Sequence, residues 1–192
     1  EKRDEIFSPG GLLAMKLSCN MNVVAFIGNW VFLHGGLNYK NTTSINDIIE
    51  TNNNIKLYLQ NKLSEKEEEE FMSKIDENWY INDRSSSKHN YESDNSDICI
   101  NFERLRNKIN RPELKMVVGH TVHHKPNAIC KIKGENSIYR IDTAMSRAFG
   151  KKRYSGDRIN VLEIIGNNVQ YLSYDINGKK IISHDFYLPN DD

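Results

Sequence analysis

The sequence has few cysteines, no excess of charge of either sign and no long apolar run. Its three cysteines, Cys19, Cys99 and Cys130, lie far apart with no CxxC spacing. We therefore expect a reducing compartment, and neither a disulfide framework nor a zinc finger. The 26 basic residues balance 26 acidic ones, which argues against nucleic acid and membrane surfaces as partners, since such binders carry a basic excess. No apolar run approaches the roughly 20 residues that cross a bilayer, so we expect a cytoplasmic protein.

The 192 residues are enough for one domain, and we treat residues 1–192 as part of a single one. Charged residues make up 27% of the chain and the mean hydropathy is -0.65, so we expect a polar globular fold with a loop-rich segment. Residues 85–97 (SSSKHNYESDNSD) carry almost nothing to bury and are expected to form an exposed, mobile loop. The chain begins at Glu1 rather than at Met, and we expect it to be a piece of something longer.

Short apolar runs separated by turn residues predict mostly strands. Residues 23–27 and 30–34 flank Gly28-Asn29, which predicts a β-hairpin because both turn residues tolerate positive φ. Ser64 with Glu67 is typical of a capping box at a helix start. Helices are predicted at 12–17, 44–50, 64–79 and 102–109, and strands at 114–118, 128–132, 138–142, 161–165, 169–174 and 181–187. The pattern predicts an α+β fold, a layered β-sandwich with flanking helices.

Two apolar strands end in a histidine beside glycine, at Leu33-His34-Gly35 and at Val118-Gly119-His120. Strand ends are where layered proteins gather functional side chains, and glycine lets a ligand or another backbone approach closely. Neutral imidazole is the commonest transition-metal ligand, so the two strand ends could hold one ion. A buried histidine bonded to a backbone carbonyl is the alternative interpretation of each.

Residues 26–37 (FIGNWVFLHGGL) resemble the strand-HGGL signature of the calcineurin-like metallophosphoesterases. Residues 116–121 (MVVGHT) and 138–146 (IYRIDTAMS) resemble the "VVGHT … IDTGMS" stretch of the bacterial-type (Shewanella-like) branch of the phosphoprotein phosphatases. Ala144 stands where that branch has glycine. The resemblance spans about residues 6–174, with the middle poorly matched.

The resemblance implies that His34 and His120 match two ligands of the second ion in a two-metal centre. Such a centre clamps a phosphate and generates a hydroxide nucleophile near neutral pH. Mixed nitrogen and oxygen ligands suit Mn, Fe or Zn, and the sequence does not choose among them. The family's earlier motifs, GDxHG, GDxxDRG and GNHE, do not occur here. The chain is thus expected to be the C-terminal portion of the catalytic domain, to need the missing N-terminal half as a partner, and to bind at most one ion weakly by itself.

Further positions carry expectations of their own. Residues 79–85 (WYINDRS) resemble the segment in which family members place a phosphate-binding arginine after a tryptophan, which makes Arg84 the candidate; a solvated loop arginine is the alternative. We expect His123 and His124 to be exposed loop residues; a place lining the cleft is the alternative. The match of Asp142 to the family's "IDTG" stretch implies a structural hydrogen-bonding role rather than that of a general base. Phe149-Gly150 is expected in core packing.

The complete protein is expected to be a metal-dependent phosphomonoester hydrolase, acting on phosphoserine, phosphothreonine or phosphotyrosine in proteins. Two other functions stay open. One is a degenerate phosphatase fold that serves as a non-catalytic binding or scaffold protein. The other is a hydrolase of the same fold that acts on nucleotides or diadenosine polyphosphates. Half of a sheet is also expected to leave a strand edge unpaired.

Overall fold

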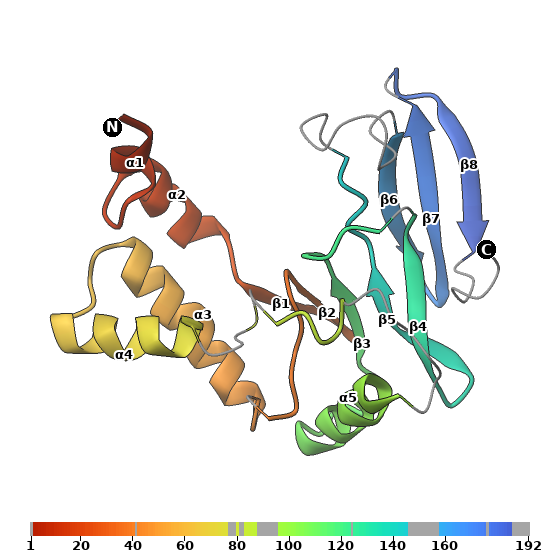
Figure 1. The fold of residues 1–192 in the computed structure, drawn as a ribbon, viewed down its shortest axis with the longest axis horizontal. Helices are drawn as coiled ribbons and strands as arrows, with labels where there is room; N and C mark the ends of the chain where they lie inside the picture. The colour runs from red at the N-terminus through yellow and green to blue at the C-terminus, as the bar shows by residue number, and fades with distance from the viewer. Residues whose placement is uncertain are drawn as a thin grey trace.

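The computed structural model describes residues 2–40, 42–76, 80, 83–87, 96–123, 125–145, 158–175 and 177–185. Its elements follow the order α1 (Lys2–Phe7), α2 (Leu12–Asn20), β1 (Val24–Ile27), β2 (Trp30–Leu33), α3 (Ile45–Leu59), α4 (Glu65–Asp76), α5 (Asp97–Lys108), β3 (Lys115–Val118), β4 (Asn127–Ile132), β5 (Glu135–Arg140), β6 (Arg158–Ile165), β7 (Asn168–Asp175) and β8 (Lys180–Asp185). The fold is α+β, with one mixed sheet, one antiparallel sheet and flanking helices (Figure 1). None of the helices described here has the length and apolar content to cross a bilayer.

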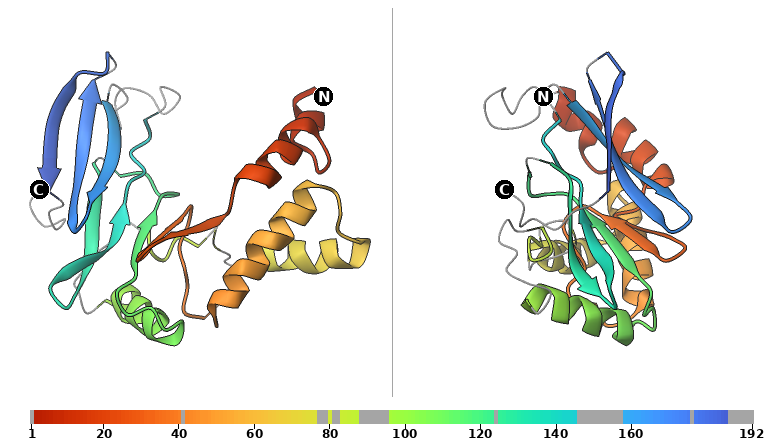
Figure 2. Two further views of the ribbon diagram at one scale, coloured as in Figure 1. Left: turned by 180° about the vertical axis from the view of Figure 1, so that it is seen from behind. Right: turned by 90° about the vertical axis from the view of Figure 1, so that its right-hand side faces the viewer.

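The mixed sheet has the strand order β1-β2-β3-β5-β4. Strands β2, β3 and β5 run parallel, while β1 and β4 pair antiparallel with β2 and β5. The second sheet is the antiparallel meander β6-β7-β8. Helices α1 to α4 lie to one side of the mixed sheet and the meander lies to the other (Figures 1 and 2).

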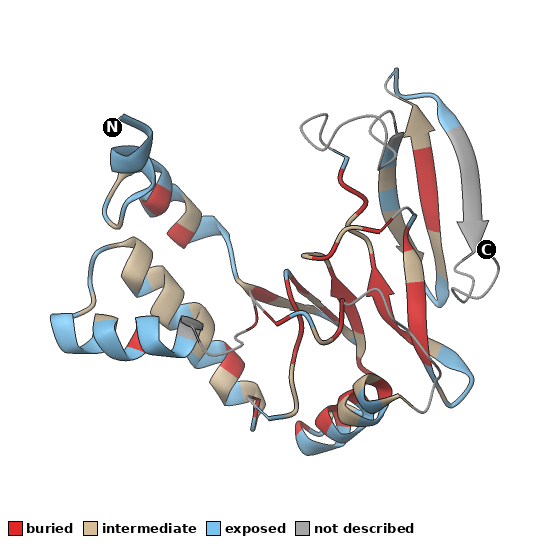
Figure 3. Ribbon diagram, in the orientation of Figure 1, coloured by how far each residue is buried: buried red, intermediate tan, exposed pale blue. Residues whose placement is uncertain are grey.

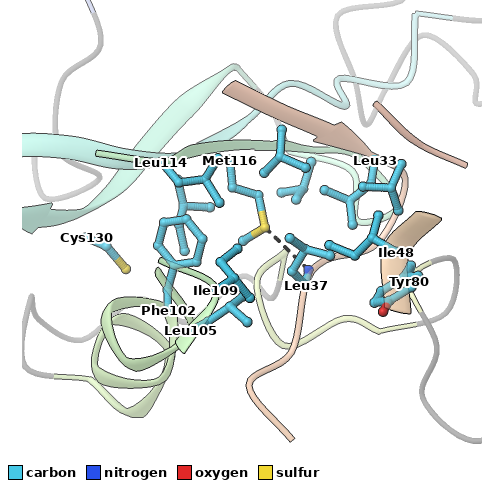
Figure 4. Packing of buried hydrophobic residues seen from close by; sticks show 14 of the residues in the cluster. Leu33, Leu37, Ile48, Tyr80, Phe102, Leu105, Ile109, Leu114, Met116 and Cys130 are labelled. Atoms are coloured by element: carbon cyan, nitrogen blue, oxygen red, sulfur yellow. Dashed lines mark hydrogen bonds between the residues drawn. The ribbon is translucent and has the colours of Figure 1, made fainter. Parts of the chain in front are cut away.

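Both faces of the mixed sheet are covered, and each has its own cluster of buried side chains. Side chains alternate between the two faces along each strand. On β3, Met116 and Val118 face the helices and Val117 faces the meander. The helix-side cluster packs α5 on the sheet through Phe102 and Leu105, and the Leu37 backbone N–H points at the Met116 sulfur 3.4 Å away (Figure 4). Buried residues concentrate in this layer, whereas α1 buries none (Figure 3).

The predicted hairpin at 23–34 is confirmed, with Gly28 at φ 57 between β1 and β2. The Ser64–Glu67 capping box is also confirmed, since the Ser64 backbone N–H donates to Glu67 at 2.8 Å. The connection between the strands predicted at 128–132 and 138–142 is shorter than those bounds imply. It is the two-residue pair Lys133-Gly134, with φ 55 and 84, so β5 already begins at Glu135. Such turns match the twist of the strands that they join.

The outer edge of β1 is partly closed by a side chain rather than by another strand. The Asn52 carboxamide on α3 accepts hydrogen bonds from the Val23 and Val24 backbone N–H groups at 3.0 and 3.1 Å. Its amide nitrogen donates to the Val24 carbonyl at 2.8 Å. This carboxamide therefore pairs with the strand as a neighbouring peptide group would, and it covers part of the edge that was expected to be open.

Two sequence predictions about the segment before β3 are wrong. Ser86 and Ser87 are 3% and 0% exposed, so these two residues are packed rather than part of an exposed loop. Helix α5 begins at Asp97, earlier than the predicted residue 102, because Cys99 and Phe102 are buried on its inner face. Residues 88–95 lie outside the described part of the chain.

The prediction that no disulfide forms is also wrong. Cys99 on α5 and Cys130 on β4 form a disulfide with a Cα–Cα distance of 5.1 Å, across 31 residues of sequence. Cys130 leaves the regular ladder, with φ 63, at the point where the strand meets the helix. Cys19 remains a free, exposed thiol. Spacing along the chain carries no information about which cysteines the packing of α5 on β4 brings together.

Tyr139 on β5 gives the fold a measurable pH dependence. Its side chain is 3% exposed, and burial, with a smaller effect of Glu135, raises the pKa of Tyr139 to about 12. An unfolded tyrosine ionises near pH 10, so this contribution to stability is complete below pH 10 and is lost as the pH rises toward 12. We expect a loss of roughly 1.4 kcal/mol per pH unit over that window.

Urea unfolding of the protein and of Tyr139→Phe at pH 9, 10 and 11 measures this effect. The difference in unfolding free energy between the two should shrink with rising pH above 10 and stay constant below it. Burial also raises the pKa of Tyr80, but that residue is present in both proteins, so its effect cancels. A difference that does not change with pH would contradict the assignment.

Candidate functional site

The candidate site lies at one edge of the mixed sheet, where the three parallel strands end. His34 directly follows β2, Gly119-His120 follows β3, and Asp142 comes two residues after β5. Because parallel strands present their carboxyl ends at the same edge, segments distant in sequence meet there (Figure 1). The Gly119 backbone N–H donates to the His34 carbonyl at 2.9 Å and holds two of these strand ends together.

The two imidazole rings touch. Nδ1 of His120 lies 2.7 Å from Nε2 of His34, and the ring centroids are 4.6 Å apart at an interplanar angle of 68°. One nitrogen of this pair donates a proton and the other accepts it, so at least one ring carries its proton on the shared side. The convergence that the sequence predicted for His34 and His120 is thus observed, across 86 residues of sequence.

The surroundings of His120 favour its neutral form, because they lower its pKa. Burial lowers its pKa most, followed by the positive charge of Arg84 and by His34, while Asp142 acts in the opposite direction. A neutral imidazole offers a lone pair to a Lewis acid. His120 also has φ 67, a conformation that is uncommon for a side chain of this size and is often found at functional sites.

Arg84 belongs to a short segment, residues 83–87, that packs against Gly36, two residues after His34. Its side chain is exposed, and its charge reaches His120. Gly36 makes the close packing possible, because a Cβ atom at that position would lie 2.9 Å from the Ser86 hydroxyl. The Asp83 carboxylate accepts from the Ser85 backbone N–H at 2.7 Å and shapes the turn.

The segment is tied to the histidine-bearing strands by residues that the sequence analysis did not single out. Arg140, 2% exposed on β5, donates through Nε to the Ser86 carbonyl at 3.0 Å. The Ser87 and Thr121 hydroxyls lie 2.8 Å apart. An arginine inside a buried strand (SIYRI) was the signal available in the sequence, since a guanidinium is buried only when it has partners.

The prediction for His123 is wrong. It was expected in an exposed loop, but it is 7% exposed, and its Nε2 lies 3.1 Å from the Ser87 carbonyl. The structural role predicted for Asp142 is observed: its carboxylate accepts from the Ala144 N–H at 3.1 Å, and its carbonyl accepts from the His123 N–H at 2.8 Å. The positions His124, Trp79 and Phe149-Gly150 lie outside the described residues.

Ala144 is strained where the resembled family has glycine. It is 3% exposed with φ 50, in the left-handed region, which costs an L-residue about 1–2 kcal/mol. We expect Ala144→Gly to raise the free energy of unfolding by about 1 kcal/mol, measured by urea denaturation. Ala128→Gly is the matched control, because Ala128 is fully buried on β4 and its φ is not positive. It should lower stability by a similar amount, and equal signs for the two substitutions would contradict the strain.

Across the described residues, no group of three or more His, Cys, Asp or Glu side chains is placed to hold a metal ion. Within the part of the chain that the structure describes, the histidine pair thus supplies at most two candidate ligands. Two nitrogens that share one tetrahedral ion at about 2.0–2.1 Å lie roughly 3.3 Å apart. The rings need to separate by well under 1 Å from their present contact, so the pair fits as part of a metal centre whose remaining ligands come from elsewhere.

The fold resembles that of a phosphatase. A solved cold-active protein tyrosine phosphatase superposes with a TM-score of 0.53 at 14% identity, over 83% of this chain and 41% of that one. A second structure, the cold-active protein-tyrosine phosphatase of a psychrophilic Shewanella species, gives 0.48 at 15% identity. This chain thus spans less than half the length of these solved structures. At such identities the likeness shows the fold alone.

By sequence, the chain is 31% identical over 188 residues to the uncharacterized protein R398 of Acanthamoeba polyphaga mimivirus, covering 84% of this chain and 71% of R398. The chain belongs to the same family as R398. No protein-family model matches the sequence.

Proposed function

We propose that this chain contributes the two-histidine part of a metal-dependent phosphomonoesterase centre, in a protein whose substrates are phosphoproteins. The contact of His120 Nδ1 with His34 Nε2 at 2.7 Å carries the proposal. The phosphatase-like fold supports it, as does the fact that the solved structure is named a protein tyrosine phosphatase. In metal centres the second ring nitrogen of a histidine ligand usually makes a hydrogen bond that fixes the orientation of the ring.

His34 and His120 would hold one divalent ion of Mn, Fe or Zn through these two nitrogens. When bound, such an ion polarises a phosphoryl oxygen and lowers the pKa of bound water. Arg84, exposed beside His120, would bind phosphate oxygens through its guanidinium. The buried Arg140 and Thr121 contacts at Ser86 and Ser87 hold the segment that carries Arg84 against the histidine-bearing strands.

Carboxylate ligands, a second ion and the proton donor to the leaving group would come from an N-terminal half carrying GDxHG, GDxxDRG and GNHE motifs. Because two imidazoles leave most of an ion's coordination to water, we expect this chain alone to bind Mn²⁺ weakly and to hydrolyse phosphomonoesters little or not at all.

Titration calorimetry of the chain with Mn²⁺ and with Zn²⁺ tests the proposal. Binding of one ion per chain should be lost in both His34→Ala and His120→Ala. The control is His184→Gln, on β8 of the other sheet, which should bind as the unmodified chain does. Ion binding that survives both histidine substitutions would overturn the proposal.

A substrate panel on the full-length protein separates the functions that the sequence left open. Hydrolysis of phosphopeptides over nucleotides supports a protein phosphatase. A preference for nucleotides or diadenosine polyphosphates contradicts the substrate class. Absence of hydrolysis together with retained metal binding indicates a non-catalytic binding protein.

A further inference from the structure

A small cavity lies beside the segment that carries Arg84. Its volume is about 120 Å³, and its described lining comes from three parts of the chain. These are residues 37–39, which follow the histidine and glycines at the end of β2, the pair Ser85 and Ser86, and the first turns of α5. The cavity is thus bordered by the same two segments that contribute His34 and Arg84 to the candidate site, and α5 supplies its third wall.

The cavity lies within reach of a substrate held at the histidine pair. Leu37 follows His34 by three residues, so their Cα atoms are at most about 10 Å apart. On the other side, Ser86 packs on Gly36, since a Cβ atom at that glycine would lie 2.9 Å from the Ser86 hydroxyl. An extended peptide advances about 3.3–3.6 Å per residue. A peptide whose phosphate is bound beside His34 can therefore place a neighbouring side chain in the cavity.

Three polar side chains of the lining have no partner among the residues that the structure describes. Asp97, the one charged residue of the described lining, is exposed and makes no ion pair or hydrogen bond there. The half-buried Asn101 carboxamide makes none either. The same holds for the Ser86 hydroxyl, although Ser86 is only 3% exposed and buried hydroxyls nearly always have a partner. The cavity thus presents a negative charge and open hydrogen-bond acceptors to an occupant.

The charge and the walls of the cavity together select the occupant. Asp97 repels a second phosphate or an acidic side chain. Leu37, Ile98 and Phe102 give the cavity apolar walls, and Figure 4 shows the first and last of them. A wholly apolar side chain would bury the Ser86 hydroxyl without a partner, which costs free energy. Lysine matches both features, because its methylene stem packs on apolar surface while its ammonium donates hydrogen bonds and pairs with a carboxylate.

The size of the cavity favours lysine over arginine. A volume of about 120 Å³ is roughly that of four water molecules in the liquid. This space suits the compact ammonium of lysine better than the planar guanidinium of arginine, which is larger and needs a wider set of partners.

We propose that the cavity is a substrate subsite that takes a lysine side chain lying within about three residues of the phosphorylated residue. The inference rests on the phosphatase function proposed above and adds to it the kind of phosphoprotein that the site selects. Arg84 and the histidine pair bind the phosphate, and Asp97 pairs with the neighbouring lysine. Asp97 also lies in the first turn of α5, where the helix dipole favours a negative charge, so the test separates recognition from helix stability.

Phosphopeptide kinetics of the full-length protein with Mn²⁺ test the subsite. The substrates are phosphotyrosine and phosphothreonine peptides of alanine and glycine that carry one lysine, one glutamate or no charge near the phosphorylated residue. The readout is the ratio of kcat/KM for a charged peptide to that for the uncharged one in the same variant, which a loss of folded enzyme does not change. Lysine at the matching position should raise kcat/KM about fivefold, the scale of a partly exposed charge pair. Asp97→Asn should remove this preference, and Asp97→Lys should transfer it to glutamate.

Two variants and one small substrate serve as controls. Glu103→Gln, at an exposed position of α5 outside the lining, and Asn53→Ala, at an exposed position of α3, should keep the lysine preference. Equal ratios for lysine and glutamate peptides, or a lysine preference that survives Asp97→Lys, would overturn the subsite, while hydrolysis of p-nitrophenyl phosphate would still support the phosphatase function. If p-nitrophenyl phosphate is not hydrolysed either, the phosphatase function itself fails, and this inference fails with it.

Discussion

Replacing Cys99 and Cys130 together by alanine should lower the free energy of unfolding by about 3–4 kcal/mol. The disulfide closes a loop across 31 residues, and loop-closure entropy of the unfolded chain predicts a loss of that size for such a loop. Both cysteines are also buried where α5 packs on the mixed sheet, with 2% and 0% of their surfaces exposed, so the alanines lose some packing contacts as well. Urea denaturation without reductant measures it.

Cys19→Ser is the control for the disulfide, because that thiol is exposed and free; stability should be unchanged. Adding a reductant to the unmodified chain should reproduce most of the loss seen in the double variant, and should have no further effect on that variant. Alkylation of the unfolded, unreduced protein followed by mass spectrometry counts the free thiols. Three labelled cysteines, or a double variant within 1 kcal/mol of the unmodified chain, would show that the bond does not form.

In the full-length protein, His34→Ala and His120→Ala should each lower kcat/KM for a phosphomonoester about 10³-fold, the scale of losing a main transition-state contact. The double variant should lose hardly more than either single variant. Both rings are proposed to hold the same ion, and residues that act as a unit have strongly non-additive effects. The 2.7 Å contact between their nitrogens is the structural reason.

Activity on p-nitrophenyl phosphate with saturating Mn²⁺ measures both single variants and the double variant. Asn53→Ala should keep full activity and serves as the control for handling and metal loading. If the two histidine losses multiply toward 10⁶, the residues act separately and the shared-ion assignment fails. If neither substitution matters, the catalytic proposal for these strand ends fails as well.

Local patterns in the sequence predicted most of the elements. The β1–β2 hairpin, the Ser64 capping box and the β6–β8 meander follow from turn residues and apolar periodicity, which act over a few residues. The same reasoning placed His34 and His120 at strand ends beside glycines. Because parallel strands end at a common edge, their meeting was predictable once both strands were assigned to one sheet.

Tertiary packing decided the rest. Residues 85–87 have a polar, loop-like composition, yet Ser86 and Ser87 are buried. Gly36 leaves room for the Ser86 side chain, and Arg140 donates a hydrogen bond to the Ser86 carbonyl, so the contacts come from distant parts of the chain. The Cys99–Cys130 disulfide and the contact of His123 with Ser87 likewise join segments with no local relation. The sequence by itself determined which residues could form strands, turns and imidazole ligands, since those preferences are local. Only the fold decided which polar side chains find partners across the core, because that depends on distances that no spacing along the chain encodes.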